Sequence, residues 1–519
     1  MQVGGASGIN AGVNAITLVN FANDFVGSVV LTGGTVQLTD ANALTVSQNA
    51  SGLSTLTAGG NLLINAGAAA GLTTVTSGTT VFGGAINVTG DLAVTSAGAV
   101  SQAGPLTVTG NSSINAGTAT VTLNNANNDF TGPLSITGGT TQVTDNNALT
   151  LGTLNTGALT VTSTGALNLG QGTVGGALTA KSNNNAITQT GALVINGTSD
   201  INAGNAPITL NNANNDFFGA VSVAGSTVQI ADKNTLPLGS LSAGSLSVAA
   251  VNSIVQDALN TGGNFTLPSG TLTINPGGSL TTVAANIAAG ALLATGGSFT
   301  ATGPVTVGGI LKGSATGPIV AMGQPVNVSS GGTLDLNGGS VTATAVNNQG
   351  LLKGVGNING NVFNDGTFSP GASPGLVNIM GNYVQGSTGL LNIEIGGTTP
   401  GTGFDKLAIT GNATLNGVLA IIQSGGFVPA VNDGFRFLTT GGTISGTFST
   451  ILVPAAFAGM SLTYQSQFTD AVASPIAPGA PGFVTNQLIA ATQQPILVLE
   501  EKKILTEEEK KQLGPSCAP

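Results

Sequence analysis

The feature that most constrains this sequence is an internal repeat built around one short phrase. NNANNDFTG spans residues 124–132, NNANNDFFG spans 211–219, and a more divergent copy, VNFANDFVG, spans 19–27. A second phrase, INAG, accompanies each copy, at 9–12, 114–117 and 201–204. A repeat at this scale is typical of solenoids and arrays, so its period restricts the fold more than any single residue does.

Two sets of aspartates measure the repeat independently. Asp24, Asp129 and Asp216 are 105 and 87 residues apart, and the aspartates of TDANAL, TDNNAL and ADKNTL show the same two intervals. The intervals differ by 18 residues. This difference indicates one structural unit that is present in the first interval and missing from the second.

Alternating apolar pairs recur within each copy at a similar distance. Ile16 and Leu18 are followed 20 residues later by Val36 and Leu38. Alternation places both side chains of a pair on one face of a strand, and Gly, Asn and Asp supply the turns between strands. The corresponding pairs in the other copies are Val121 and Leu123 before Thr141 and Val143, and Ile208 and Leu210 before Val228 and Ile230.

These short strands predict an all-β fold, a parallel β-helix or solenoid. One coil cannot bury its own apolar face, but stacking on the next coil about 4.8 Å away pairs its backbone and covers its interior. Residues 1 to about 450 would form roughly 22 coils and a rod on the order of 100 Å long. A β-sandwich array is the competing fold, and the 18-residue difference disfavours it because it requires fixed boundaries near every 100 residues.

Composition excludes several functions. Charged residues make up 6% of the chain, and the ten basic residues include four in the last 20 positions. Nucleic acid is therefore not expected as a partner, because a surface that follows phosphates needs clustered Lys and Arg. No transmembrane segment is expected, since the richest apolar run, ILVPAAFAGM, has only ten residues where a spanning helix needs roughly 18 or more.

The phrase NNANNDFTG has two interpretations. Asn and Asp adopt left-handed conformations and bond nearby amides, which suits a sharp corner between strands; Phe130 would pack in this corner and Gly132 would lead into the next strand. Alternatively, Asp129 with Asn127 and Asn128 would bind a cation such as calcium. A single carboxylate supplies too few charged ligands for a cation site, so we favour the interpretation as a corner. We predict no metal site, no cofactor-binding site and no cofactor.

The repeats resemble filamentous-haemagglutinin-type exoproteins of Gram-negative bacteria over about residues 8–290. INAG, NNANNDFTG, SITGGTTQVTDNNALTLG and GALTVTSTGALNLGQGTVGGALTAKSNNNAITQTGAL carry this resemblance. It implies a right-handed β-helical rod, export with an outer-membrane secretion partner (two-partner secretion), and adhesion to host-cell or surface glycan or protein receptors. The implied location is extracellular or on the outer surface of a Gram-negative cell.

A second region resembles the segment that closes autotransporter-like passengers. It comprises GVGNINGNVFNDGTFSPGASPGLVNIMGNYVQGSTGLLNIEIGG and GFDKLAITGNATLNGVLAIIQSGGFVPAVNDGFRFLTT. Because the last coil of a solenoid exposes an edge that must be covered, we predict a C-terminal β cap here. The expected organisation is a β-helical repeat array at 1–290, irregular coils at 291–345, the cap at 346–450, a Pro/Gly-rich linker at 451–485 and a charged helical tail at 486–519.

The N-terminus shows no signal peptide, and the INAG phrase at residues 9–12 indicates that the array does not start with this chain. We therefore expect either the C-terminal part of a larger exoprotein or a truncated reading frame. In the tail, Thr506 and Glu509 form a capping box that predicts a short helix. Cys517 excludes an internal disulfide because it is the only cysteine, and it leaves open an anchoring tail.

Most enzyme chemistries lack the necessary residues. There is no histidine for a nucleophilic triad, and polysaccharide lyase chemistry would have to rely on Arg436 and Glu394, the only arginine and the only glutamate before the tail. GVGNING at 354–360 has the wrong glycine spacing for a dinucleotide loop. We predict a non-enzymatic adhesin or display rod without catalytic residues; the alternative is a carbohydrate-active β-helix of the glycoside hydrolase type that uses paired aspartates.

Overall fold

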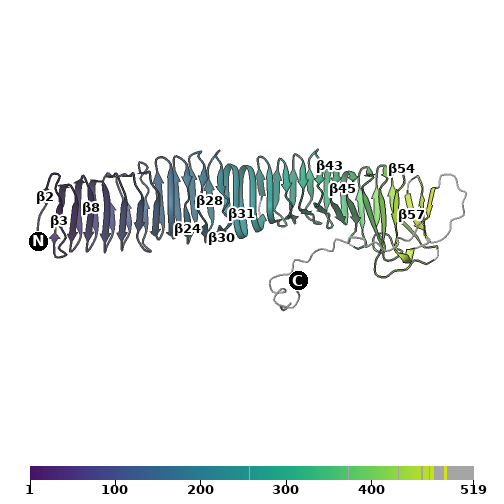
Figure 1. Ribbon diagram of the computed structural model, residues 1–519, viewed down its shortest axis with the longest axis horizontal. Coiled ribbons are helices and arrows are strands. Elements are labelled where there is room, and N and C mark those ends of the chain that lie inside the picture. Colours follow the sequence, from purple (N-terminus) through teal and green to yellow (C-terminus); the bar gives the residue numbers. More distant parts are fainter. Residues whose placement is uncertain are drawn as a thin grey trace, which may run out of the picture.

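The computed structural model forms one long parallel β-solenoid (Figure 1). It describes residues 1–255, 258–371, 373–430, 432–457, 460–466, 468–472 and 484–487. About 60% of the chain is strand and 1% is helix, and the strands wind through about 19 turns. The predicted all-β solenoid is therefore confirmed.

Each regular coil has three strands, and each strand pairs in parallel with the strand three places further along the chain. Three ladders thus run side by side along the rod, because every coil returns the chain to the same three faces. One coil and its successor illustrate this: β13 (Leu92–Ser96) pairs with β16 (Ser112–Asn115), β14 (Val100–Gln102) with β17 (Val121–Leu123), and β15 (Leu106–Val108) with β18 (Asp129–Phe130).

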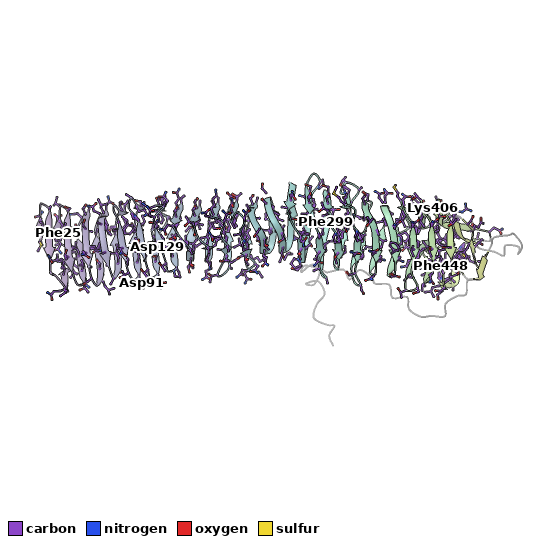
Figure 2. The ribbon with its side chains drawn as sticks, turned by 90° about the horizontal axis from the view of Figure 1, so that it is seen from above. Phe25, Asp91, Asp129, Phe299, Lys406 and Phe448 are labelled. Carbon is purple, nitrogen blue, oxygen red and sulfur yellow. The ribbon has the colours of Figure 1, made fainter. Side chains whose placement is uncertain are left out.

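The core consists of stacked aliphatic side chains inside the coil. Val94 of β13, Ile114 of β16 and Ile136 of β19 (Leu134–Gly138) are consecutive rungs of one ladder and are all buried. Each such side chain contributes roughly 1.5–3 kcal/mol when it leaves water. Buried phenylalanines recur from Phe25 near one end to Phe448 near the other (Figure 2), so one continuous core runs the length of the rod.

The predicted register of the apolar pairs is confirmed. Ile16 lies beside Val36 and Leu18 beside Leu38 in the ladder of β3 (Ile16–Leu18) and β6 (Val36–Asp40). The corresponding pairs of the other two copies also lie beside each other. The interval of about 20 residues in the sequence is therefore the length of one coil.

The predicted number of coils was too high. Coils lengthen toward the C-terminal end, where Leu407 of β50 (Lys406–Ile409) lies beside Leu438 of β53 (Gly434–Thr440), 31 residues later. Most of the additional residues lie between strands, where ten positions separate β52 (Val418–Gln423) from β53. The chain therefore makes about 19 turns instead of roughly 22.

Parallel coils continue through the range in which we predicted the cap, up to β55 (Thr450–Leu452) beside β52 (Val418–Gln423). Among the described strands, antiparallel ladders begin where β57 (Phe468–Val472) lies beside β53 and β56 (Ser461–Tyr464). The edge of the last coil at β53 is thus covered by strands that run in the opposite direction.

The final antiparallel strand, β58 (Val484–Gln487), lies beside β56. The predicted helix around Thr506 and the cysteine at 517 lie outside the described residues. A single short helix, η1 (Ala455–Phe457), occurs in the described part of the linker. Within the residues that the structure describes, no helix has the length and apolar character needed to cross a membrane.

Candidate functional site

The repeated phrase NNANNDF forms a corner that its own side chains hold together. Asn128 is completely buried; its Oδ1 atom accepts hydrogen bonds from the Leu106 amide at 2.9 Å and from Gln102 Nε2 at 2.7 Å. Its Nδ2 atom donates to the Leu123 carbonyl at 3.0 Å. Asn215 makes the same set of contacts in the next copy. The interpretation of the phrase as a structural corner is therefore confirmed.

The prediction that the Asn and Asp residues of this phrase adopt left-handed backbone conformations was wrong. Non-glycine residues with positive φ in the described chain are Asn184, Asn337, Ser373 and Asn432, and none belongs to the three copies. The left-handed positions are instead the glycines of INAG, with φ close to +60°. An asparagine two residues earlier accepts a hydrogen bond from each glycine amide. These pairs are Asn10 with Gly12, Asn115 with Gly117, and Asn202 with Gly204.

The glycine that ends each copy is required by close stacking of coils. A Cβ atom added to Gly132 would lie far inside van der Waals contact with the backbone of Gly110, one coil earlier. Gly27 faces Gly5 and Gly219 faces Gly197 in the same way. Two coils thus approach at these corners as closely as two glycine backbones allow.

The aspartate of TDANAL, TDNNAL and ADKNTL connects each corner to the following coil. Asp145 is buried; its Oδ2 accepts from the Phe130 amide at 2.7 Å and its Oδ1 accepts from the Asn147 amide at 2.9 Å. Asp40 and Asp232 make equivalent pairs of bonds. Burial raises the pKa of Asp145 and of Asp232 above the usual value, although the backbone hydrogen bonds oppose the rise.

The residues considered for a cation site are placed as follows. Asn128 points inward and uses its amide oxygen in the corner, whereas Asn127 is exposed and Asp129 is half-buried on the outside. Oδ1 of Asp129 accepts a long hydrogen bond from Thr131 Oγ1 at 3.4 Å. In the described ranges, no three or more His, Cys, Asp or Glu side chains gather where they could hold a metal ion.

A buried acidic residue occurs closer to the C-terminal end. Asp405 is 1% exposed; its Oδ1 accepts from the Gly375 amide at 2.7 Å and its Oδ2 accepts from the Glu394 amide at 2.8 Å. Burial raises the pKa of Asp405 to about 7, and the nearby Glu394 carboxylate adds to the rise. Because both oxygens are occupied by backbone N–H groups, Asp405 connects two segments of neighbouring coils.

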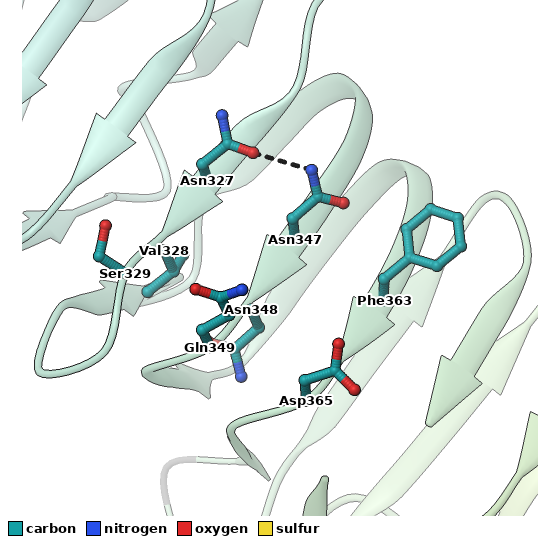
Figure 3. A pocket seen from close by; sticks show the side chains of 8 residues that line it. All are labelled: Asn327, Val328, Ser329, Asn347, Asn348, Gln349, Phe363 and Asp365. Atoms are coloured by element: carbon teal, nitrogen blue, oxygen red, sulfur yellow. Dashed lines mark hydrogen bonds between the residues drawn. The ribbon is translucent and has the colours of Figure 1, made fainter. Parts of the chain in front are cut away.

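An open hollow of about 540 Å³ lies on the outside of the rod (Figure 3). It spans three successive coils, at β41 (Val326–Val328), β43 (Ser340–Asn348) and β45 (Gly356–Asn364). These strands are parallel neighbours in one ladder. The hollow is therefore built by the stacking of coils, and each coil contributes an outward strand residue and a corner residue; Val328 and Asn348 complete the lining.

The outward-facing strand residues of the hollow are two amides and one aromatic ring. Asn327 lies beside Asn347, and Asn347 lies beside Phe363. Asn347 Nδ2 donates a hydrogen bond to Asn327 Oδ1 at 2.8 Å (Figure 3). The Phe363 side chain is 41% exposed, because the preceding and following residues of its strand face the core. A row of polar amides thus ends at an exposed ring.

The corner residues of the hollow are Ser329, Gln349 and Asp365, which follow the three strands at equivalent positions. The Gln349 amide donates to the Val328 carbonyl at 2.8 Å, and the Asp365 amide donates to the Asn348 carbonyl at 2.8 Å. These backbone bonds hold the corners in line. The lining contains one carboxylate and no basic side chain, so it disfavours an anionic ligand.

Asn348 forms the inner side of the hollow. Its side chain is buried; Nδ2 donates to Asn364 Oδ1 at 2.7 Å and to the Thr367 carbonyl at 2.8 Å. Its Oδ1 atom has no hydrogen-bond partner among the described residues. A buried acceptor without a donor is costly.

The hollow was not predicted from the sequence. Its signal is present in three consecutive phrases, VNVSSG, VNNQG and VFNDG, which begin at residues 326, 346 and 362. The middle residue of V-F-N is an aromatic at an outward position of a strand, where a polar residue is expected. Which coils would be adjacent was not evident, because these phrases are 20 and 16 residues apart.

One family model matches this chain. It is described as "Repeats of unknown function (DUF5649)" and covers residues 1–32, 69–137 and 156–224. The last residues of these segments are 105 and 87 positions apart, as are the aspartates of the NDF corners, so the model follows the same repeat. No curated protein matches the chain in sequence. The chain is therefore a repeat protein with β-solenoid architecture.

Proposed function

We propose that this chain is a non-enzymatic adhesin or display rod, secreted or exposed on the surface of a Gram-negative cell, within a larger exoprotein. The observation that carries the proposal is the uninterrupted parallel stack of about 19 turns. Such a stack holds its outer residues at fixed spacing over a long distance. A function that requires reach and repeated contacts uses this geometry, whereas a compact catalytic site does not need it.

The surface chemistry supports contact through neutral polar groups. Outward positions in the ladders are rich in Thr, Ser and Asn, such as Thr306, Asn327 and Asn347 in successive rungs of one face. With only 6% charged residues, the rod has little long-range electrostatic attraction for a partner. Recognition would depend on hydrogen bonds and on shape, with surface glycans or receptor proteins as partners. By resemblance, export would use an outer-membrane secretion partner.

The alternative is a carbohydrate-active β-helix. One candidate carboxylate pair is Asp405 and Glu394, since burial raises the pKa of Asp405 and the Glu394 carboxylate lies nearby. Burial of Asp405 and the two backbone bonds to its carboxylate argue for a structural role. Saccharide turnover by the purified chain, abolished in Asp405→Asn or Glu394→Gln, would establish the alternative.

The adhesin proposal is tested in the source cells. Intact cells are treated with a protease that does not enter them, and the medium, surface and cytoplasmic fractions are analysed by peptide mass spectrometry across this sequence. We expect its peptides in the medium or the outer-membrane fraction, in a species larger than 50.2 kDa, and released by the protease. A species of about this mass confined to the cytoplasm and protected from the protease would overturn the proposal.

A further inference from the structure

We propose that the hollow over β41, β43 and β45 binds a neutral saccharide of two to three sugar units. The sugar would stack on Phe363 and would be hydrogen-bonded by Asn327, Asn347 and Asp365. This inference rests on the proposed function and names its ligand class and its site. It is carried by the juxtaposition of an exposed ring, an amide ladder and a carboxylate in one hollow.

The ring supplies an apolar platform beside polar groups. Phe363 is 41% exposed and belongs to the lining, although its strand neighbours are buried. A pyranose has an apolar face of C–H groups and a rim of hydroxyls, so it requires an aromatic face with polar groups next to it. Binding sites for small molecules typically combine a hydrophobic or aromatic wall with a few placed polar groups. The hollow has both.

The amides and the carboxylate match the hydroxyl rim. An asparagine offers two N–H donors and an acceptor oxygen, and Asn347 uses one donor in its 2.8 Å bond to Asn327. Asp365 offers acceptors only, which suits two adjacent hydroxyls. Together these groups favour a ligand with many hydroxyl groups.

The dimensions and the charge restrict the ligand further. Three neighbouring strands span about 10 Å at the usual spacing, which accommodates a di- or trisaccharide laid along the rod axis. The lining has no basic side chain and one carboxylate. Sulfated, phosphorylated or sialylated sugars are therefore disfavoured against neutral ones.

The test uses the full chain on an array of neutral, sulfated and sialylated oligosaccharides. The best neutral probe is then titrated by calorimetry against the wild type and four variants. Phe363→Ala and Asn347→Ala alter the hollow. Phe218→Ala is the control for the ring, because Phe218 is 60% exposed and belongs to another part of the rod. Asn378→Ala is the control for the ladder, because Asn378 donates an equivalent 2.8 Å bond to Asn357 outside the hollow.

We expect binding of a neutral probe that weakens at least tenfold in Phe363→Ala and several-fold in Asn347→Ala, with less than twofold change in both controls. Circular dichroism would show that all four variants remain folded. Failure of every neutral probe to bind the wild type, equal loss in the controls, or exclusive binding of anionic probes would overturn the inference. Binding of calcium alone, blocked by Asp365→Asn, would also overturn it.

The saccharide-binding test and the test of the proposed function can fail independently of each other. A chain that is displayed on cells but binds no neutral saccharide would retain the rod function and lose this site. A chain confined to the cytoplasm would lose the rod function whether or not the purified hollow binds a sugar.

Discussion

Asp145 accepts a hydrogen bond from the backbone amide of Phe130, which belongs to the previous coil, at 2.7 Å. The same bond joins Asp40 to Phe25 and Asp232 to Phe217, each at 2.7 Å and each across 15 residues of sequence. The NDF phrase and the aspartate phrase that follows it (TDANAL, TDNNAL or ADKNTL) therefore form one hydrogen-bonded unit. It connects the corner of one coil to the strand end of the next.

Replacing this aspartate should loosen its corner. In Asp145→Asn one oxygen acceptor becomes an NH₂ group, which would face an amide N–H. A hydrogen bond to a charged acceptor contributes roughly 1.5–3 kcal/mol, and removal of the buried charge offsets part of the loss. We expect a decrease of about 1–2 kcal/mol in the free energy of unfolding. Hydrogen exchange of the Phe130 amide should accelerate as well.

The matched control is Asp129→Asn in the same copy. Asp129 is half-buried, and its carboxylate accepts a long bond from Thr131. Equal acceleration of Phe130 exchange in both variants would contradict a specific role for Asp145.

Removing the buried asparagine of the corner should lower the free energy of unfolding more than Asp145→Asn does. Asn128→Ala leaves the Leu106 amide without its acceptor and Gln102 Oε1 without its donor, although Gln102 Nε2 keeps its bond to the Gly104 carbonyl. Because each buried polar group left unsatisfied costs roughly 1–3 kcal/mol, we expect a loss of at least about 3 kcal/mol in urea unfolding. Asn124→Ala serves as the control, since Asn124 is exposed and donates one bond to Gln142 at 3.1 Å. Similar losses in both variants would show that the corner amide has no special role.

The glycine at the end of the phrase should not tolerate a methyl group. In Gly132→Ala the new Cβ would overlap the Gly110 backbone, which cannot move without shifting a coil. We expect a destabilisation of about 1–3 kcal/mol, measured as a lower midpoint of thermal unfolding. Gly8→Ala is the control, because a Cβ at Gly8 meets no atom within 4 Å. A stable Gly132→Ala variant would mean that neighbouring coils are not packed this closely.

Asp405 should make stability depend on pH. Its folded pKa is raised to about 7 from 3.8, so the folded protein holds this proton more tightly than the unfolded chain does. The resulting stabilisation is fully present below pH 3.8 and is lost as pH rises toward 7. It amounts to at most about 4 kcal/mol. Asp405→Asn should flatten this dependence, as urea unfolding between pH 4 and pH 8 would show. Parallel curves for the two proteins would refute the assignment.

Removing divalent metals should leave the corners unchanged. The buried Asn and Asp oxygens of the corner already accept hydrogen bonds from the protein, so they need no cation. We expect the midpoint of thermal unfolding to be the same with EDTA and with added calcium, within experimental error. A rise with calcium that disappears in Asp129→Asn would restore the cation interpretation of the phrase.

Much of the fold could be predicted from local patterns. Alternation in pairs such as Ile16 and Leu18, returning at Val36 and Leu38, reports strand faces directly because side chains alternate along a strand. The corner and the bonds of its side-chain oxygens to backbone amides were also predictable, as Asn128 shows. The left-handed position was not, because it is Gly117 of the INAG phrase. A single sequence does not distinguish a left-handed asparagine from one that bonds through its side chain, because both occur in turns.

The sequence by itself determined the all-β class, the length of the early coils and the positions of the corners, since these depend on periodic patterns within about 20 residues. Only the tertiary structure decided what lies side by side across coils. Gly132 against Gly110, Asp405 between Gly375 and Glu394, and Asn347 between Asn327 and Phe363 are all such neighbours. Coil lengths vary, and each additional loop residue changes where the next strand lies in the sequence. The hollow depends on this register, because its residues come from three coils and become a surface only after stacking.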